Sequence, residues 1–322
     1  MDGNVLRALL AQLSGTAVPH TCVIDGWQVS PLVGGTNNLL YRATNADDDV
    51  VIKWCIRDYR RRAMREYAAL TLMDAVAPGC APMPILVDET QYHQPVVVQA
   101  YVDGEVLTNP PAGDAEWHEL IACLVTIHGV SMRDDPSIHP AVINADSVAA
   151  ARQMIRMQLE VIPADEWPST LREIVRALDA TAIAELPPAS LSLCHVDSNH
   201  RNFIRTNASM VAVDWENSGW GDPAFEIAEL IAHPAYLVVP PIRWQWVIDT
   251  YCRMMGQADI RHRIETHLRI YRVWWVARFA RYLYEVPRQR DQRLVVRDAA
   301  WMDDLQRKYD RYLRDAWVGL AV

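Results

Sequence analysis

The sequence lacks several features that would assign it to a specialised class of protein. Its six cysteines are scattered without a CxxC pair, so neither a zinc site nor a disulfide framework is indicated, and a reducing cytosol is expected. No uninterrupted apolar run approaches the roughly 20 residues of a membrane helix, and no N-terminal basic-then-apolar signal is present. We therefore expect a cytoplasmic protein with no membrane partner.

An excess of basic charge is also missing. The 31 lysines and arginines stand against 40 aspartates and glutamates, which gives a net charge of −9. Nucleic-acid binding needs a basic footprint, so no nucleic-acid partner is expected. The acidic balance either favours a cationic ligand or serves solubility alone, and composition does not choose between the two.

The chain has the length and composition of a globular protein with two lobes. Its 322 residues are 51% hydrophobic and 22% charged, and this length exceeds what one compact core usually supports. Strand-like runs dominate residues 23–102 and enclose one helical pattern at 59–75. We predict an α+β fold with a strand-rich N-terminal lobe at 1–102 and a helical C-terminal lobe at 103–322.

The second lobe shows repeated helical spacing. Asp114 is a candidate N-cap for the first of these helices, and the only convincing strand-like stretch lies at about 190–215. The remaining helical patterns cover residues 147–159, 169–185, 244–255 and 261–285.

A glycine-rich turn separates two of the predicted strands. It reads GGTNN and contains Gly34, Gly35, Thr36 and Asn37. Glycines let backbone amides approach a phosphate closely, but a plain hairpin turn has the same composition. Both interpretations stay open for this turn taken alone.

Lys53 lies in the otherwise apolar strand VVIKW. A lysine with buried neighbours needs a counter-charge, and Glu66, 13 positions later on the predicted helix, is suited to supply it. The alternative is a lysine that extends along an edge strand to reach water.

Polar residues cluster between two apolar runs in LCHVDSNHRNFIRTNASMVAVDWE. His195, Asp197 and Asn202 form the pattern HxDxxxxN, and Asp214 follows at the end of the next strand. Phosphoryl transfer needs a carboxylate to orient the attacking hydroxyl, together with an amide and a second carboxylate that hold magnesium. This pattern therefore predicts a kinase site.

The chain resembles the aminoglycoside phosphotransferase and choline kinase superfamily over about residues 25–235. The resemblance rests on segments in the order GGTNN, VVIKW, REYAAL, VVVQAYVDGE, LVTIHGV, LCHVDSNHRN and VAVDWENSGWGDPAFEIAEL. It implies a two-lobed protein-kinase-like fold, with one main helix on a small antiparallel sheet, in which residues 1–102 form the nucleotide-binding lobe and residues 103–322 the catalytic and substrate-binding lobe. It also implies a phosphotransferase that uses ATP and Mg²⁺ as cofactors.

The resemblance also implies roles for single residues. Asp197 matches the catalytic aspartate, Asn202 and Asp214 match the magnesium ligands, and Lys53 with Glu66 matches the ion pair that positions the nucleotide.

The strand VVVQAYV matches the hinge that grips adenine. This match places Gln99, Tyr101 and Val102 at the base, and the turn at 34–37 at the phosphates.

Further matches concern the support of the catalytic loop. His195 matches a histidine that mainly supports the loop, and Asp222 and Glu226 match the pair that anchors it. Glu226 replaces an aspartate, Val196 replaces a small residue, and Arg201 replaces a frequent glycine. Arg201 either contacts phosphate or forms a salt bridge across the loop.

The acceptor is a small molecule with a hydroxyl, and its identity is open. Aromatic residues at 271–284 would suit a choline-like ammonium, but their helical spacing is also that of a core. Acidic residues at 285–310 would suit an aminoglycoside or form a solvated helix face. An aminoglycoside-type kinase, a choline or ethanolamine kinase and a non-catalytic nucleotide-binding module all remain, as do a monomer and a homodimer.

Overall fold

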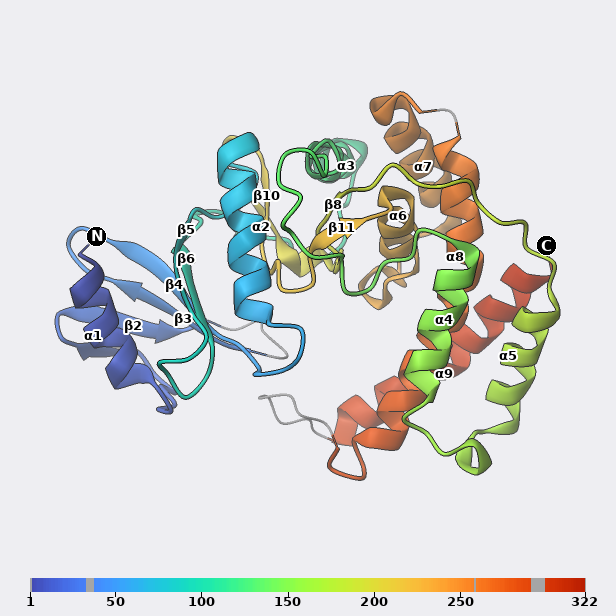
Figure 1. Ribbon diagram of the computed structural model, residues 1–322, viewed down its shortest axis with the longest axis horizontal. Helices are drawn as coiled ribbons and strands as arrows, with labels where there is room; N and C mark the ends of the chain where they lie inside the picture. The colour runs from blue at the N-terminus through green and yellow to red at the C-terminus, as the bar shows by residue number, and fades with distance from the viewer. Residues whose placement is uncertain (1, 33–37, 258, 291–298, 322) are drawn as a thin grey trace.

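The computed structural model describes residues 2–32, 38–257, 259–290 and 299–321. It has two lobes, one built on a sheet and one mainly of helices (Figure 1). The predicted α+β class and the two-lobed, protein-kinase-like architecture are confirmed. The proposed boundary at 102–103 falls in the loop between β6 and β7. None of the helices in the described ranges is both long and apolar enough to cross a membrane.

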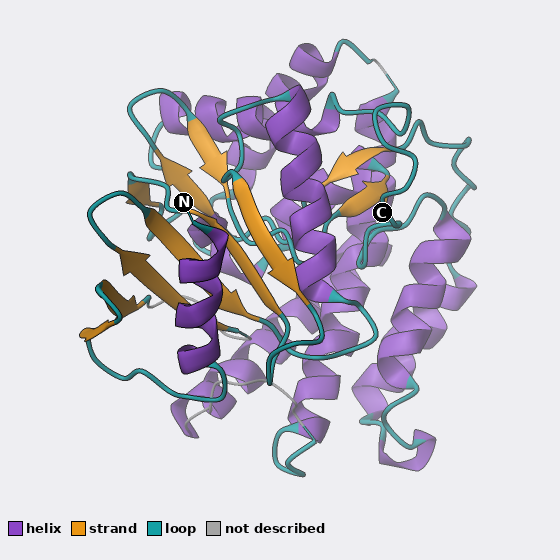
Figure 2. Ribbon diagram, turned by 60° about the vertical axis from the view of Figure 1, so that its left-hand side comes forward, coloured by secondary structure: helices purple, strands orange, loops and turns teal. Residues whose placement is uncertain are grey.

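The first lobe is a six-stranded antiparallel sheet in the order β1-β2-β3-β4-β6-β5. Its strands are β1 (Cys22–Ile24), β2 (Trp27–Pro31), β3 (Leu39–Thr44), β4 (Asp49–Trp54), β5 (Pro84–Asp88) and β6 (Val96–Ala100). Figure 2 shows α1 (Gly3–Leu13) against one face of this sheet. The sequence analysis did not predict α1, although its buried leucines recur at helical spacing.

The alternation of side chains along β4 decides which of them face the site. Val50, Ile52 and Trp54 belong to the core beneath α1. Cys55 packs instead with Ala63 of α2 (Arg62–Val76) on the opposite face. Because strand side chains alternate, Lys53 also points toward α2.

Helix α2 begins three residues later than predicted and lies between the lobes (Figure 1). Arg61, its N-cap, has a left-handed backbone (φ 52°). Leu70 and Met73 are fully buried in the same core cluster as Trp117 and Leu120 of the helical lobe. The helix therefore packs on the sheet with one side and on the second lobe with the other.

The second lobe consists mainly of long helices. These are α3 (Asp114–His128), α4 (Val148–Leu159), α5 (Ser169–Ala180), α6 (Pro223–Ala232), α7 (Pro241–Met255), α8 (Ile260–Glu285) and α9 (Ala299–Leu320). The predicted N-cap at Asp114 is wrong: Gly113 is the N-cap, and Asp114 lies in the first turn, where its charge complements the helix dipole. Helix α5 ends at residue 180 rather than 185, and α6 and α9 were not predicted.

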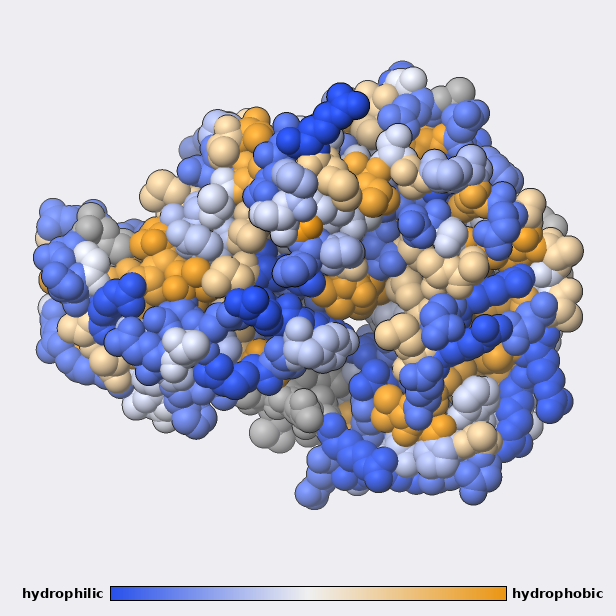
Figure 3. Space-filling model, viewed as in Figure 1, coloured by the Kyte–Doolittle hydropathy of each residue, from blue (hydrophilic) through white to orange (hydrophobic). Residues whose placement is uncertain are grey.

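Short strands frame the site within this lobe. β8 (Ser192–Cys194) pairs with β11 (Gly219–Gly221), and β9 (Phe203–Arg205) pairs with both β10 (Met210–Ala212) and β7 (Glu105–Val106). Figure 3 shows the surface hollowed between the two lobes.

Candidate active site

Lys53 is buried at the centre of a group of carboxylates. Its ammonium lies 2.6 Å from Glu66 Oε2, forms an ion pair with Asp214 Oδ1 and lies 3.8 Å from Glu216 Oε2. The side chain is only 3% exposed, so the alternative of a lysine reaching to water is wrong. The Lys53–Glu66 pair is present in the structure, while its action on a nucleotide stays a prediction.

This group carries more negative than positive charge. Burial raises the pKa of Glu66 to about 7 against the opposing effect of Lys53. Burial also lowers the pKa of Lys53, but Asp214 and Glu66 outweigh it and hold that pKa well above its ordinary value. The lysine is therefore charged, and the surplus of carboxylates creates a place for a further cation.

Glu216 was missed by the sequence analysis, although it follows Asp214 by two residues. It forms an ion pair with Arg62 at 2.5 Å and accepts a hydrogen bond from Asn38 Nδ2 at 2.5 Å. It therefore joins α2, the end of the glycine-rich turn and Lys53. Gly34, Gly35, Thr36 and Asn37 themselves lie outside the described residues.

The loop that follows β8 and contains Asp197, which we call the catalytic loop after its expected role, has an unusual backbone. Val196 and Asp197 have φ values of 55° and 141°, and Asp214 has 68°. Side chains other than glycine rarely adopt these values, which cost on the order of 1–3 kcal/mol each and persist only where surrounding contacts impose them. The surrounding structure thus holds Val196, Asp197 and Asp214 in strained backbone conformations.

Carboxylates of α6 impose this loop conformation. Glu226 accepts hydrogen bonds from the backbone N–H groups of His195 at 2.9 Å and Val196 at 3.0 Å, and Glu229 accepts one from Ser198 N at 3.0 Å. The anchoring role expected for Glu226 is therefore present in the structure.

Asp222 has a different role from the one expected. It caps α6 by accepting a hydrogen bond from Ala224 N at 2.9 Å, and it binds His267 at 3.0 Å and the guanidinium of Arg263 on α8. Its oxygens therefore tie α6 to α8, and in the described part of the chain its carboxylate forms no hydrogen bond with the catalytic loop.

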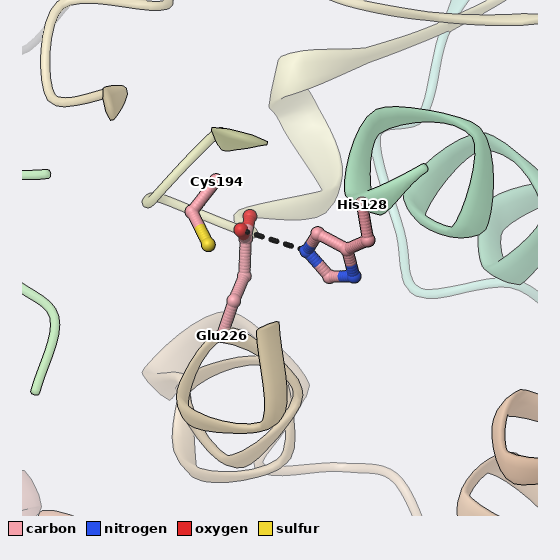
Figure 4. A group of neighbouring side chains, drawn as sticks. All are labelled: His128, Cys194 and Glu226. Carbon is pink, nitrogen blue, oxygen red and sulfur yellow. Dashed lines mark hydrogen bonds and ion pairs between the residues drawn. The ribbon is translucent and has the colours of Figure 1, made fainter. Parts of the chain in front are cut away.

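Figure 4 shows the group formed by His128, Cys194 and Glu226. His128 Nε2 lies 3.0 Å from Glu226 Oε2, and its Nδ1 lies 2.7 Å from Tyr251 Oη. Burial raises the pKa of Cys194 well above its ordinary value, so this thiol is neutral and a poor metal ligand. The donors already have partners, and we interpret the group as the support of Glu226. In the sequence, the signal available for this group was His128, a histidine within the apolar helical stretch LVTIHGV.

Asp197 extends from the loop into a cavity. Its Oδ1 lies 3.5 Å from His233 Nε2, and the side chain is 35% exposed. Burial raises the pKa of Asp197, but the hydrogen bond and charge of His233 outweigh it, so that the pKa falls below its ordinary value. The group is a carboxylate at neutral pH. His195, in contrast, points inward, with Nε2 2.8 Å from Val213 O, which agrees with a supporting role.

Asn202 and Asp214 are linked to the same loop. Asn202 Nδ2 donates to Asp197 O at 3.0 Å, and Val213 N donates to Asn202 O at 2.8 Å. Carboxylate and amide oxygens are the ligands that Mg²⁺ prefers, and the surplus negative charge around Lys53 suits a divalent cation. The residues present therefore fit a magnesium site.

The expected adenine-binding strand is β6. Gln99 is buried, and its Oε1 has no hydrogen-bond partner among the described residues. The ring of Tyr101 is covered by the guanidinium of Arg42, 3.7 Å from the ring centre, and its backbone N–H donates to Asp49 O. Contact of Gln99, Tyr101 and Val102 with a nucleotide stays a prediction.

A cavity of about 450 Å³ lies beside Asp197. It is bounded by the loop after β4, the catalytic loop and one face of α8. Tyr271 and Trp274 are buried in the core, which confirms the core interpretation for these rings; they also line the cavity, and binding of a ligand by them stays a prediction. Arg201 is exposed and is not among the lining residues.

Comparison with known proteins agrees with this geometry. The family model described as "Phosphotransferase enzyme family" matches residues 28–240. No curated protein matches the sequence.

Solved structures share the fold at low sequence identity. A candidate aminoglycoside phosphotransferase of Ralstonia eutropha JMP134 is 15% identical with a TM-score of 0.70, covering 99% of this chain and 98% of that one. A choline/ethanolamine kinase family protein of Mesorhizobium loti is 20% identical with a TM-score of 0.64, covering 100% and 98%. A spectinomycin phosphotransferase in complex with ADP and spectinomycin is 15% identical with a TM-score of 0.63, covering 98% of each chain. On the strength of the family match, the chain belongs to the phosphotransferase enzyme family.

Proposed function

We propose that the protein is a kinase that transfers the γ-phosphate of ATP to a hydroxyl of a small-molecule acceptor. The observation that carries this proposal is the linkage of Asp197, which lines the cavity, to Asn202 and, through the bond from Val213 N to Asn202 O, to the strand end that carries the Lys53–Asp214 ion pair. The spectinomycin phosphotransferase, which has this fold, was solved with ADP, which supports the use of a nucleotide. The protein is proposed to act in the cytoplasm as a monomer or homodimer.

Each part of the site has a proposed task. Lys53, positioned by Glu66, binds phosphate oxygens, and the turn at 34–37 covers them with backbone amides. Gln99, Tyr101 and Val102 bind the adenine. Asn202 and Asp214 would hold Mg²⁺, which when bound would neutralise charge on the transferred phosphate.

Asp197 is the proposed catalytic residue. Its carboxylate accepts the proton of the acceptor hydroxyl, while the hydroxyl oxygen forms a bond to the γ-phosphorus. The bond from that phosphorus to the β–γ bridging oxygen breaks, and ADP leaves with the bonding electrons. Because the loop is anchored before substrate binds, the carboxylate is pre-positioned, and little reorganisation is needed at the moment of transfer.

The variant Asp197→Asn tests this role. We expect kcat to fall by about 10²–10⁴-fold, the usual contribution of a positioned proton acceptor, with ATP affinity unchanged. ADP release measures the first quantity and titration calorimetry the second. Turnover retained at the parental level would remove Asp197 from the role. Binding of ATP without transfer to any acceptor by the parental protein would favour the non-catalytic module.

A choline or ethanolamine kinase is the second candidate function. Aromatic faces attract quaternary ammonium groups, and Tyr271, Trp274 and Trp275 line the cavity beside Asp197. ADP release in the presence of choline or ethanolamine tests it directly.

A further inference from the structure

The charge of the cavity wall differs from that of the whole chain. Among the residues that the structure describes, five arginines and four carboxylates line the cavity, whereas the chain as a whole carries a net charge of −9. The arginines are Arg60, Arg62, Arg278, Arg281 and Arg290, and the carboxylates are Asp58, Asp197, Glu229 and Glu285. The wall is therefore locally richer in cations than its surroundings.

Most of these carboxylates already have partners. Asp58 forms an ion pair with Arg62 at 2.9 Å, and Glu285 forms one with Arg281 at 2.9 Å. Glu229 is fully buried beneath the catalytic loop, where burial raises its pKa to about 7. A polycationic acceptor would therefore find few carboxylates on this wall that are charged and not already paired.

Arginine donors, in contrast, remain for a ligand. Arg281 Nε is buried without a hydrogen-bond partner in the described part of the chain. Within the described ranges, the one hydrogen bond of the Arg60 guanidinium is to a neutral amide oxygen, Asn217 Oδ1, at 3.4 Å. Arg290 bonds the neutral hydroxyl of Tyr284 at 3.1 Å. Guanidinium groups bind carboxylate and phosphate oxygens through paired, charge-assisted hydrogen bonds, so these donors favour an anionic ligand.

Helix α8 runs from the part of the cavity beside Asp197 to Arg281. His233 lies 3.5 Å from Asp197 and packs edge-on against Trp275, with ring centres 5.6 Å apart. Arg281 follows Trp275 by six residues, which is about 9 Å along a helix that rises about 1.5 Å per residue. Asp197 and Arg281 line the same cavity, so an acceptor held beside the carboxylate can extend along α8 toward the guanidinium.

We propose that the acceptor is an organic anion, a hydroxyl compound whose carboxylate or phosphate group is bound by Arg281 and Arg60. The aromatic rings lie at the catalytic end of the cavity, and the arginines bind the far end of the acceptor. This inference rests on the proposed kinase function. It disagrees with the hypothesis of a cationic acceptor, which the sequence left open as one option.

A matched set of small molecules tests the charge of the acceptor. The anionic probes are D-glycerate, 4-hydroxybutyrate, sn-glycerol 3-phosphate and D-ribose 5-phosphate. Glycerol and D-ribose are the neutral counterparts, and ethanolamine, choline and spectinomycin are the cationic ones. Each is measured by thermal shift without nucleotide, and by ADP release with ATP and Mg²⁺, at constant ionic strength so that non-specific screening is equal.

We expect an anionic probe to raise the melting temperature and to accelerate ADP release at least tenfold over its neutral counterpart. The carboxylate and phosphate probes distinguish the two sources of negative charge. Preference for a neutral or cationic probe would overturn the inference while leaving the kinase proposal intact. Absence of any response to the four anionic probes, in protein that binds ATP, would also overturn it. Absence of ATP binding would instead refute the kinase proposal, and the shifts measured without nucleotide would still decide the charge of the ligand.

The variant Arg281→Gln locates the anion. We expect KM for the anionic acceptor to rise at least tenfold, with little change in kcat or in KM for ATP. Arg176→Gln on the exposed face of α5 makes the same change of charge away from the cavity and should leave both constants unchanged. Arg60→Gln is a second variant, on a different element, should Arg281→Gln fold poorly. Unchanged KM for the anionic acceptor in a folded variant of each arginine would contradict the assignment.

Discussion

The two halves of the cleft are built from opposite kinds of charge. In the half that handles phosphate, Glu66, Asp214 and Glu216 surround a single lysine. In the half that faces the acceptor, arginines outnumber carboxylates. The first arrangement, even with Arg62 paired to Glu216, has one carboxylate more than it has cations and suits the proposed Mg²⁺, and the second suits the proposed anionic acceptor. The comparison indicates that the reaction and the choice of acceptor are set by separate groups of residues.

Replacing Lys53 by Met is expected to have the largest effect, because it removes the cation of the carboxylate-rich half. Breaking one side of a buried ion pair typically costs about 3–5 kcal/mol of unfolding free energy. ATP-dependent turnover should be lost as well. Urea unfolding and ADP release are the measurements.

Lys308→Met is the matched control, since the chain has only two lysines. Lys308 lies on α9 and pairs with Asp304 at the surface, where such a pair is worth about 0.5 kcal/mol or less. Equal losses of stability in the two variants would contradict the buried network.

A smaller effect is expected when the anchor of the catalytic loop is weakened. Glu226→Gln keeps the shape of the side chain but replaces one acceptor oxygen by an N–H₂ donor opposite a backbone N–H. Leaving a buried donor unsatisfied costs about 1–3 kcal/mol, and the displaced Asp197 should lower kcat. Glu173→Gln, on the exposed face of α5, is the control. A lowered kcat with unchanged KM for the acceptor would show that the two halves act separately. A raised KM would show that the anchor of the catalytic loop also affects acceptor binding.

The smallest expected effect concerns the contact between helices α6 and α8. In this contact, Asp222 on α6 binds Arg263 and His267 on α8. Burial raises the pKa of Asp222, but these two partners outweigh it and hold the pKa below the ordinary value of 3.8. The stabilisation is therefore present above that value and is lost as the pH falls through the lower, folded pKa.

Acid titration of unfolding free energy, compared between the parental protein and Asp222→Asn, tests this sign. The difference between them should shrink on acidification below about pH 4, by no more than about 1.4 kcal/mol per pH unit for one group. A difference that grows as the pH falls would contradict the pairing.

The phosphate half could be predicted from the sequence because its residues follow one another in short motifs. Asp197, Asn202 and Asp214 lie within 18 positions, as the sequence shows, and Lys53 is the one charge in an apolar strand. Glu216 was missed because a glutamate after a strand gains meaning only when Arg62 and Asn38 come to it from other elements.

The acceptor half could not be predicted, because it is formed by the packing of α8 against the loop after β4. Aromatic and acidic residues near α8 were considered from the sequence as candidates for binding the acceptor, but the arginines of α8 were not. Whether these arginines face a cavity depends on tertiary structure. Helix α9 is different: Leu305, Tyr309, Tyr312 and Ala316 are buried at regular helical spacing, and this signal was available in the sequence. The position of His128 beside Glu226 required the fold itself.

Helix α2 has a mechanical consequence for the whole protein. It follows β4 in the chain and packs on the sheet, yet Leu70 and Met73 are buried in the core of the other lobe. The two lobes therefore share one apolar core instead of meeting at a loose polar interface, which is the usual basis for independent domain motion. Because Lys53 lies on the sheet and Glu66 on α2, a displacement of the sheet relative to the helical lobe would act on the bond between these two residues.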